Sequence, residues 1–132
     1  MLTKKREVQR RGGDRFSLPM AAATIIHGGA LVVLDGGLAK PGYTATGLVA
    51  KGVSEGFFDN KGTDAALRAD VRSEALFAFD NKADDPVVYA DIGNDCYIHD
   101  DHTVAKTDGT GTRSIAGVVR DVDGGIIWIS FK

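Results

Sequence analysis

Pairs of turn residues cut this chain into short apolar runs, and their spacing constrains the fold more than any other feature. Asp35-Gly36-Gly37 separates an apolar run at 30–34 from one at 38–40, and Asp123-Gly124-Gly125 separates 115–122 from 126–131. Such pairs are strong hairpin signals, because glycine adopts positive φ without strain. The runs leave no room for the helical crossovers that parallel strands need. Many short strands with closely spaced turns predict a sandwich or barrel.

Alternation of apolar and charged residues is clearest between Arg68 and Phe79. In an extended chain Ala69, Val71 and Phe77 share one face, and the charged residues between them share the other. The same charges scatter around the axis of a helix. The pattern therefore predicts one long, half-buried strand over residues 68–79.

Proline and glycine qualify two other extended segments. Residues 16–23 contain Pro19, which is confined to the edge or the start of a strand because it lacks an N–H donor. Residues 47–58 read as a strand with a bend or bulge near Gly52 or Gly56.

The rest of the pattern offers at most one short helical turn, near Tyr89–Ile92 and ended by Gly93. Cys96–His99 and Thr103–Lys106 then pair as a hairpin through residues 100–102. The predicted fold class is all-β: a compact small β-barrel or sandwich, built from short antiparallel hairpins, with an extended N-terminal arm.

Basic residues are concentrated at the start of a chain that is otherwise acidic. Residues 1–15 hold six cations against two acids, a net charge of +4, and the remaining residues hold ten against sixteen, a net charge of −6. The segment has no periodic pattern, so we expect an extended or disordered arm that orders on a partner. The chain then divides into a basic arm, residues 1–15, and a single β-rich domain, residues 16–132.

This arm suits either a nucleic acid or an acidic protein surface. No aromatic residue precedes Phe16 to stack on bases, and the acidic body repels a phosphate backbone. We therefore interpret the arm as a protein-docking segment and expect no direct contact with nucleic acid. The docking residues we expect are Lys4, Lys5, Arg6, Arg10, Arg11, Arg15, Phe16 and Leu18.

Composition favours a small core and an oligomer. Hydrophobic residues make up 43% of the 132 residues, but aromatic residues only 8%. Small domains bury a modest share of their surface, and association compensates for this. The C-terminal hairpin is apolar on both faces, so it lies centrally in a barrel or packs on a neighbouring subunit. No apolar run approaches the about 20 residues that a membrane helix needs, so we expect no membrane partner.

The densest set of reactive side chains lies between Cys96 and His102. A nucleophilic cysteine needs surroundings that favour the thiolate, whereas Asp95 beside Cys96 raises the pKa of a thiol. Residues 99–102 alternate between the two faces of a strand and splay outward in a tight turn, which favours a solvated turn over a metal site. We expect no catalytic residue, no metal and no cofactor.

Five stretches of this sequence also carry a family resemblance. They are LPMAAAT (18–24), GGALVVLDGGLAKPG (28–42), TATGLVAKG (44–52), ADIGNDCYIHDDHTVAKTDGTGTRSIAGVV (90–119) and VDGGIIWI (122–129). Together they resemble the capsid decoration, or cement, proteins of tailed bacteriophages and prophages. The resemblance covers nearly the whole chain and is most specific over residues 90–119.

The resemblance implies a structural virion protein that is made in the bacterial host cytoplasm. Such a protein binds as a homotrimer on the outer capsid surface, across neighbouring major capsid proteins, and is not an enzyme. His99 and His102 depart from the apolar or amide residues expected there, and the loop at 60–66 has no counterpart. Two alternatives stay open: another virion component, such as a tail or head-fibre attachment module, and a Cys/His hydrolase or metal-binding enzyme centred on residues 96–102.

Overall fold

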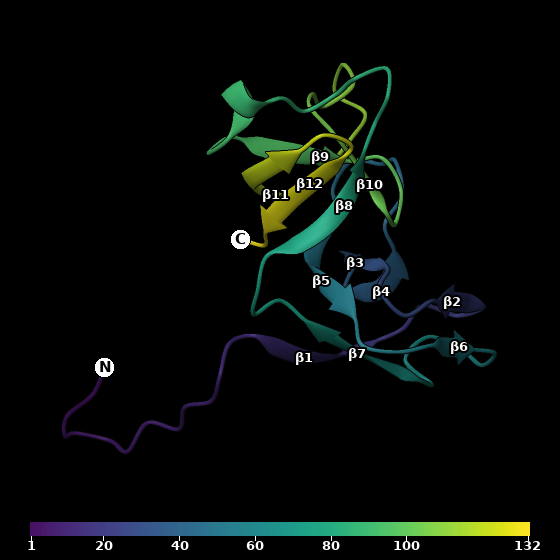
Figure 1. Ribbon diagram of the computed structural model, residues 1–132. Coiled ribbons are helices and arrows are strands. Elements are labelled where there is room, and N and C mark those ends of the chain that lie inside the picture. Colours follow the sequence, from purple (N-terminus) through teal and green to yellow (C-terminus); the bar gives the residue numbers. More distant parts are fainter.

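The chain forms two stacked β layers, and its N-terminal segment leaves the lower layer as an extended arm (Figure 1). The structure is a computed structural model that describes residues 1–132. Its only helical element is a single 3-10 turn, η1 (Tyr89–Asp91). The predicted all-β fold with at most one short helical turn is confirmed. No helix here has the length and apolar character needed to span a bilayer.

The lower layer is a five-stranded antiparallel sheet. Its strands, in spatial order, are β1 (Arg15–Pro19), β7 (Arg68–Arg72), β5 (Val49–Ser54), β3 (Leu31–Asp35) and β4 (Leu38–Pro41). A parallel bridge between Met20 and Ala39 brings the two outer strands together. Pro19 ends an edge strand, as predicted, and its missing N–H interrupts no ladder.

The upper layer is a closed five-stranded barrel. In order around it lie β10 (Thr103–Ala105), β8 (Phe77–Asn81), β12 (Ile126–Ser130), β11 (Ile115–Asp123) and β9 (Asp95–Ile98). All neighbours are antiparallel except β10 and β8. A separate ribbon of β2 (Thr24–Ile26) and β6 (Phe58–Asn60) projects beside the lower sheet (Figure 1).

The two predicted Asp-Gly-Gly turns are present, and each contains glycine with positive φ. Gly36 and Gly37 have φ of 58° and 86° and join β3 to β4, and Gly124, with φ of 60°, opens the turn between β11 and β12. Near Gly52 the pairing of β3 with β5 shifts register, which confirms the predicted bulge. The predicted hairpin of β9 and β10 is confirmed as well.

The prediction of one strand over residues 68–79 is wrong. The chain pairs in the lower sheet as β7, leaves it at Ser73, and enters the barrel as β8 from Phe77. Val71 is buried in the core of the lower sheet, whereas Phe79 is buried in the barrel core. Both strands bury their odd-numbered residues, so the alternation of apolar and polar residues continues through the link between them. The sequence pattern therefore gives no sign of the break.

β3 is the wall between two hydrophobic cores. Leu31 and Val33 point into the core that fills the barrel and the space below it, and Val32 points into the core of the lower sheet. All three side chains are fully buried. An unbroken apolar run suits a strand covered on both faces, which is why LVVL shows no alternation.

Candidate functional site

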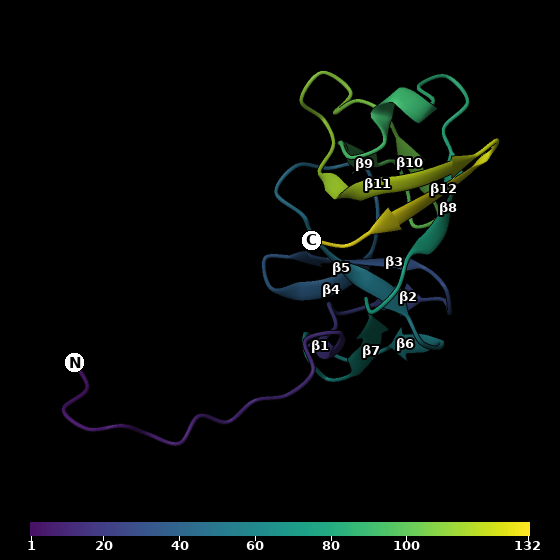
Figure 2. The ribbon, with the colours of Figure 1, turned by 60° about the vertical axis from the view of Figure 1, so that its left-hand side comes forward.

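The N-terminal arm, residues 1–14, extends away from the body (Figure 2). Its first thirteen residues are all exposed. One hydrogen bond ties it to the body, from the Ser73 amide to the Asp14 carbonyl (2.8 Å). None of its five cations forms an ion pair. The arm is therefore a cationic segment whose charges are unused within its own chain.

Arg15 and Phe16, two of the expected docking residues, lie on the first strand of the body. Arg15 is the first residue of β1, and its guanidinium donates to Glu55 at 2.6 Å. Phe16 is half-buried, with the Lys51 ammonium 3.9 Å from its ring centroid. Pairing of β1 with β7 places Arg15 opposite Arg72 and Phe16 opposite Val71.

Leu18, another of the expected docking residues, is buried in the body. It is 8% exposed and lies in the core of the lower sheet beside Met20, which is fully buried. Both side chains pack in the core of their own chain. Of the expected docking residues, only the five cations of residues 1–14 are exposed and unpaired: Lys4, Lys5, Arg6, Arg10 and Arg11.

Cys96 lies inside the barrel on β9. Its side chain is fully buried, and its thiol contacts the Gly117 carbonyl at 3.7 Å. Burial, reinforced by the nearby Asp95 carboxylate, raises the pKa of Cys96 to about 12. A thiol held neutral in this way is a poor nucleophile and a poor metal ligand.

Three side chains of the β9–β10 turn come together, contrary to the expected outward splay. Ligand atoms of Asp100, Asp101 and His102 lie within 4.8 Å of one another. The Asp100 carboxylate accepts a hydrogen bond from the His102 backbone N–H at 2.9 Å, and this bond closes the turn. His102 also contacts Asp80, and this hydrogen bond raises the pKa of the imidazole. Asp100 and Asp101 are half-buried and His102 is exposed, so the group lies at the surface of the turn.

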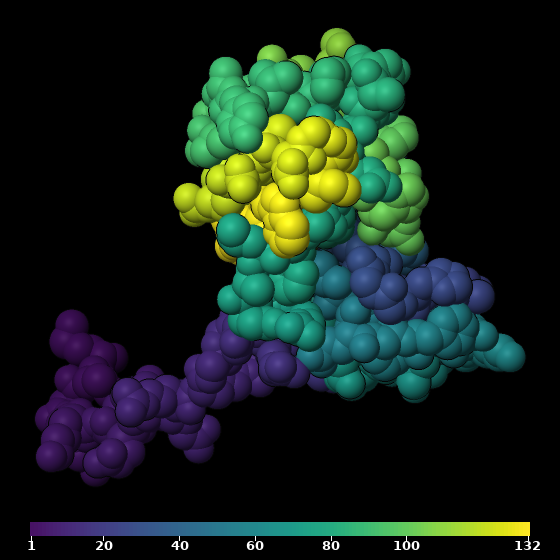
Figure 3. Space-filling view, viewed as in Figure 1, coloured from purple at the N-terminus to yellow at the C-terminus, as the bar shows by residue number.

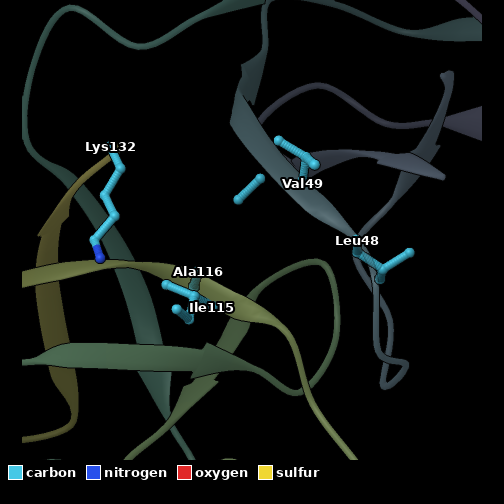
Figure 4. A pocket seen from close by; sticks show the side chains of 6 residues that line it. Leu48, Val49, Ile115, Ala116 and Lys132 are labelled. Carbon is cyan, nitrogen blue, oxygen red and sulfur yellow. The ribbon is translucent and has the colours of Figure 1, made fainter. Parts of the chain in front are cut away.

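An apolar hollow lies between the layers, near the C-terminus (Figure 4). Its volume is about 190 Å³. Its lining residues are Leu48, Val49, Ala50, Ile115, Ala116 and Lys132. The Lys132 ammonium is held by Asp95 at 2.7 Å, so the hollow offers apolar contact and no free catalytic group. The predicted apolarity of both faces of the C-terminal hairpin is the only sequence signal that pointed to it.

No protein-family model, curated protein or solved structure matches this chain.

Proposed function

We propose that this protein is a structural virion component that decorates and stabilises a phage capsid. It binds as a homotrimer on the outer surface, across neighbouring major capsid proteins, and the basic arm docks on the shell. The observation that carries the proposal is the arm. It has five unpaired cations, and a single hydrogen bond, at its last residue, connects it to the body. The sequence resemblance to decoration proteins supports the same function.

The body suits an adhesive protein. Its two small cores share β3, and most of its ionised groups are exposed. Within residues 96–102, the Cys96 thiol is buried and the His102 imidazole pairs with Asp80 at the surface. These features favour a protein that acts through its surface, and they give the Cys/His alternative no activated nucleophile.

Magnitudes indicate how the arm binds. Fixing one residue's backbone costs about 1–2 kcal/mol, whereas an exposed ion pair contributes about 0.2–1 kcal/mol. Five such pairs cannot order fourteen residues by themselves. We therefore expect the charges to set encounter rate and register, and only a short part of the arm to become fixed through main-chain and apolar contacts.

The proposal is tested by binding the purified protein to capsids that lack it. Replacing Lys4, Lys5 and Arg6 with Gln removes about 0.6–3 kcal/mol of pair energy, which weakens binding about 3- to 150-fold. The matched control replaces Lys61, Lys106 and Lys132 with Gln. It changes the net charge equally, at exposed sites of the body.

Equal binding by the arm variant and the wild type would contradict the arm's role. A cryo-EM map of decorated heads decides location, and density confined to the tail or to head fibres would favour the other virion component. Light scattering of the purified protein measures whether it is a trimer. Metal bound at stoichiometric amounts would favour the Cys/His alternative.

A further inference from the structure

The outer face of the barrel carries an aromatic patch surrounded by carboxylates. Strand β12 runs between β8 and β11, and register places Trp128 between Ala78 and Asp121. In the next outward row, Ile126 lies between Asp80 and Asp123. Directly opposed residues on neighbouring strands lie about 4.5–5.5 Å apart, so these two rows form one continuous surface. We call it the Trp128 face, and its residues are Ala78, Asp80, Asp121, Asp123, Ile126 and Trp128.

The two large apolar side chains of this face are partly exposed. Trp128 is 36% exposed and Ile126 is 37% exposed, although their neighbours in sequence, Ile127 and Ile129, are fully buried inside the barrel. Trp128 is the only tryptophan in the chain. An exposed indole flanked by an isoleucine is typical of a contact surface rather than of a solvated one.

The acidic members of this face have no Lys or Arg partner. Asp121 and Asp123 take part in no ion pair, and Asp80 contacts only His102, at 3.1 Å. Arg120, the nearest cation on β11, donates to the Ser130 hydroxyl instead. The face therefore combines three carboxylates with an aromatic ring, and a cation can stack on such a ring while pairing with the acids around it.

The segment that complements this face is the arm. Its cations, Lys4–Arg6 and Arg10–Arg11, are separated by Val8, an exposed apolar residue that suits the isoleucine of the face. Its charge opposes that of the face, and within one chain neither the cations of the arm nor Asp121 and Asp123 form an ion pair. Extended, fourteen residues reach about 46–50 Å, which is long enough to cross to another molecule.

We propose that the arm of one copy docks across the Trp128 face of a second copy. Its root is fixed at the lower sheet by Asp14 and Arg15, and it leaves the body sideways (Figures 1 and 2), while the C-terminal strands lie on the face turned toward the viewer in Figure 3. This docking needs no capsid. It concerns the free protein, and it makes a neighbouring copy a competitor of the shell for the arm.

A charge swap tests the proposal on the full-length chain. One variant carries Lys4→Glu, Lys5→Glu and Arg6→Glu, and the other carries Asp121→Lys and Asp123→Lys. Each variant alone sets like charges against each other, so its dissociation constant for self-association rises about tenfold or more. Mixed together they restore association, because the acidic arm meets the basic face and the native arm meets the native face.

Sedimentation measures the association, and Trp128 emission reports it at the face itself. In the wild type, emission shifts to shorter wavelength as protein concentration rises, because the ring is covered. The shift is lost in about 1 M salt, where charges are screened beyond about 3 Å. The control variant, Asp84→Lys with Asp108→Lys, makes the same charge change at exposed sites off the face and keeps association.

Several results would overturn the proposal. One is emission that does not change with concentration in a monomer, because the arm would then reach only its own face or none. Another is an oligomer that both variants leave intact, or a mixture that restores nothing. An intact trimer of this kind would leave the proposed capsid function standing. If the lysine variant does not fold, Asp121→Asn with Asp123→Asn replaces it, and unchanged association would again count against docking.

Discussion

At the scale of single residues, two glycines of the β11–β12 hairpin differ in whether a side chain would fit at their positions. A Cβ on Gly117 would lie 2.4 Å from the Ser130 carbonyl oxygen of β12, whereas a Cβ on Gly125 would meet nothing within 4 Å. Neither residue has positive φ. Gly117 is therefore required by the close approach of two strands.

We expect Gly117→Ala to lower the free energy of unfolding by about 1–3 kcal/mol, the usual cost of overpacking. Gly125→Ala is the matched control and should stay within about 0.5 kcal/mol of the wild type. Urea denaturation measures both. Equal stability of the two variants would show that β11 and β12 are not as close as described.

The Cys96 thiol gives a second prediction at this scale. With a pKa of about 12, only about one molecule in ten thousand carries a thiolate at about pH 8. A disulfide thiol reagent should leave the native protein unlabelled and react fully once urea unfolds it. Fast, complete labelling of the native protein would revive the nucleophile hypothesis.

At the scale of elements, β3 should respond to substitution on both of its faces. Leu31→Ala should cost about 2–5 kcal/mol and Val32→Ala about 2 kcal/mol, because the two side chains are buried in different cores. Val49→Ala, on the neighbouring strand and 56% exposed, is the control. In a strand with one solvated face, either Leu31→Ala or Val32→Ala would be nearly neutral, and urea denaturation distinguishes the two cases.

Secondary-structure elements could be predicted from the sequence wherever the backbone conformation requires one residue type. The turns at Gly36, Gly37 and Gly124 could be located because few other residues adopt positive φ. The break between β7 and β8 could not, since alternation states which face a residue takes but not which sheet it joins. Convergence of Asp100 and His102 depends on a side-chain hydrogen bond within the turn, and residue order alone does not encode it.

At the scale of the whole molecule, arm and body are energetically separate. Removing residues 1–13 breaks no hydrogen bond to the body, so the free energy of unfolding should change by less than about 0.5 kcal/mol. Removing residues 1–19 deletes β1 and takes Leu18 out of the core, and should destabilise the fold strongly. Urea denaturation of both truncations checks this; a large loss from the shorter truncation would contradict the separation.

The shared strand β3 has a mechanical consequence. Because one strand contributes side chains to both cores, a disturbance of the packing around Leu31 and Val33 acts directly on the strand that carries Val32. A pull applied to the barrel therefore reaches the lower sheet through the side chains that β3 directs into the barrel core. A protein that must withstand tension across its thickness gains resistance from this arrangement without a larger core or a covalent crosslink.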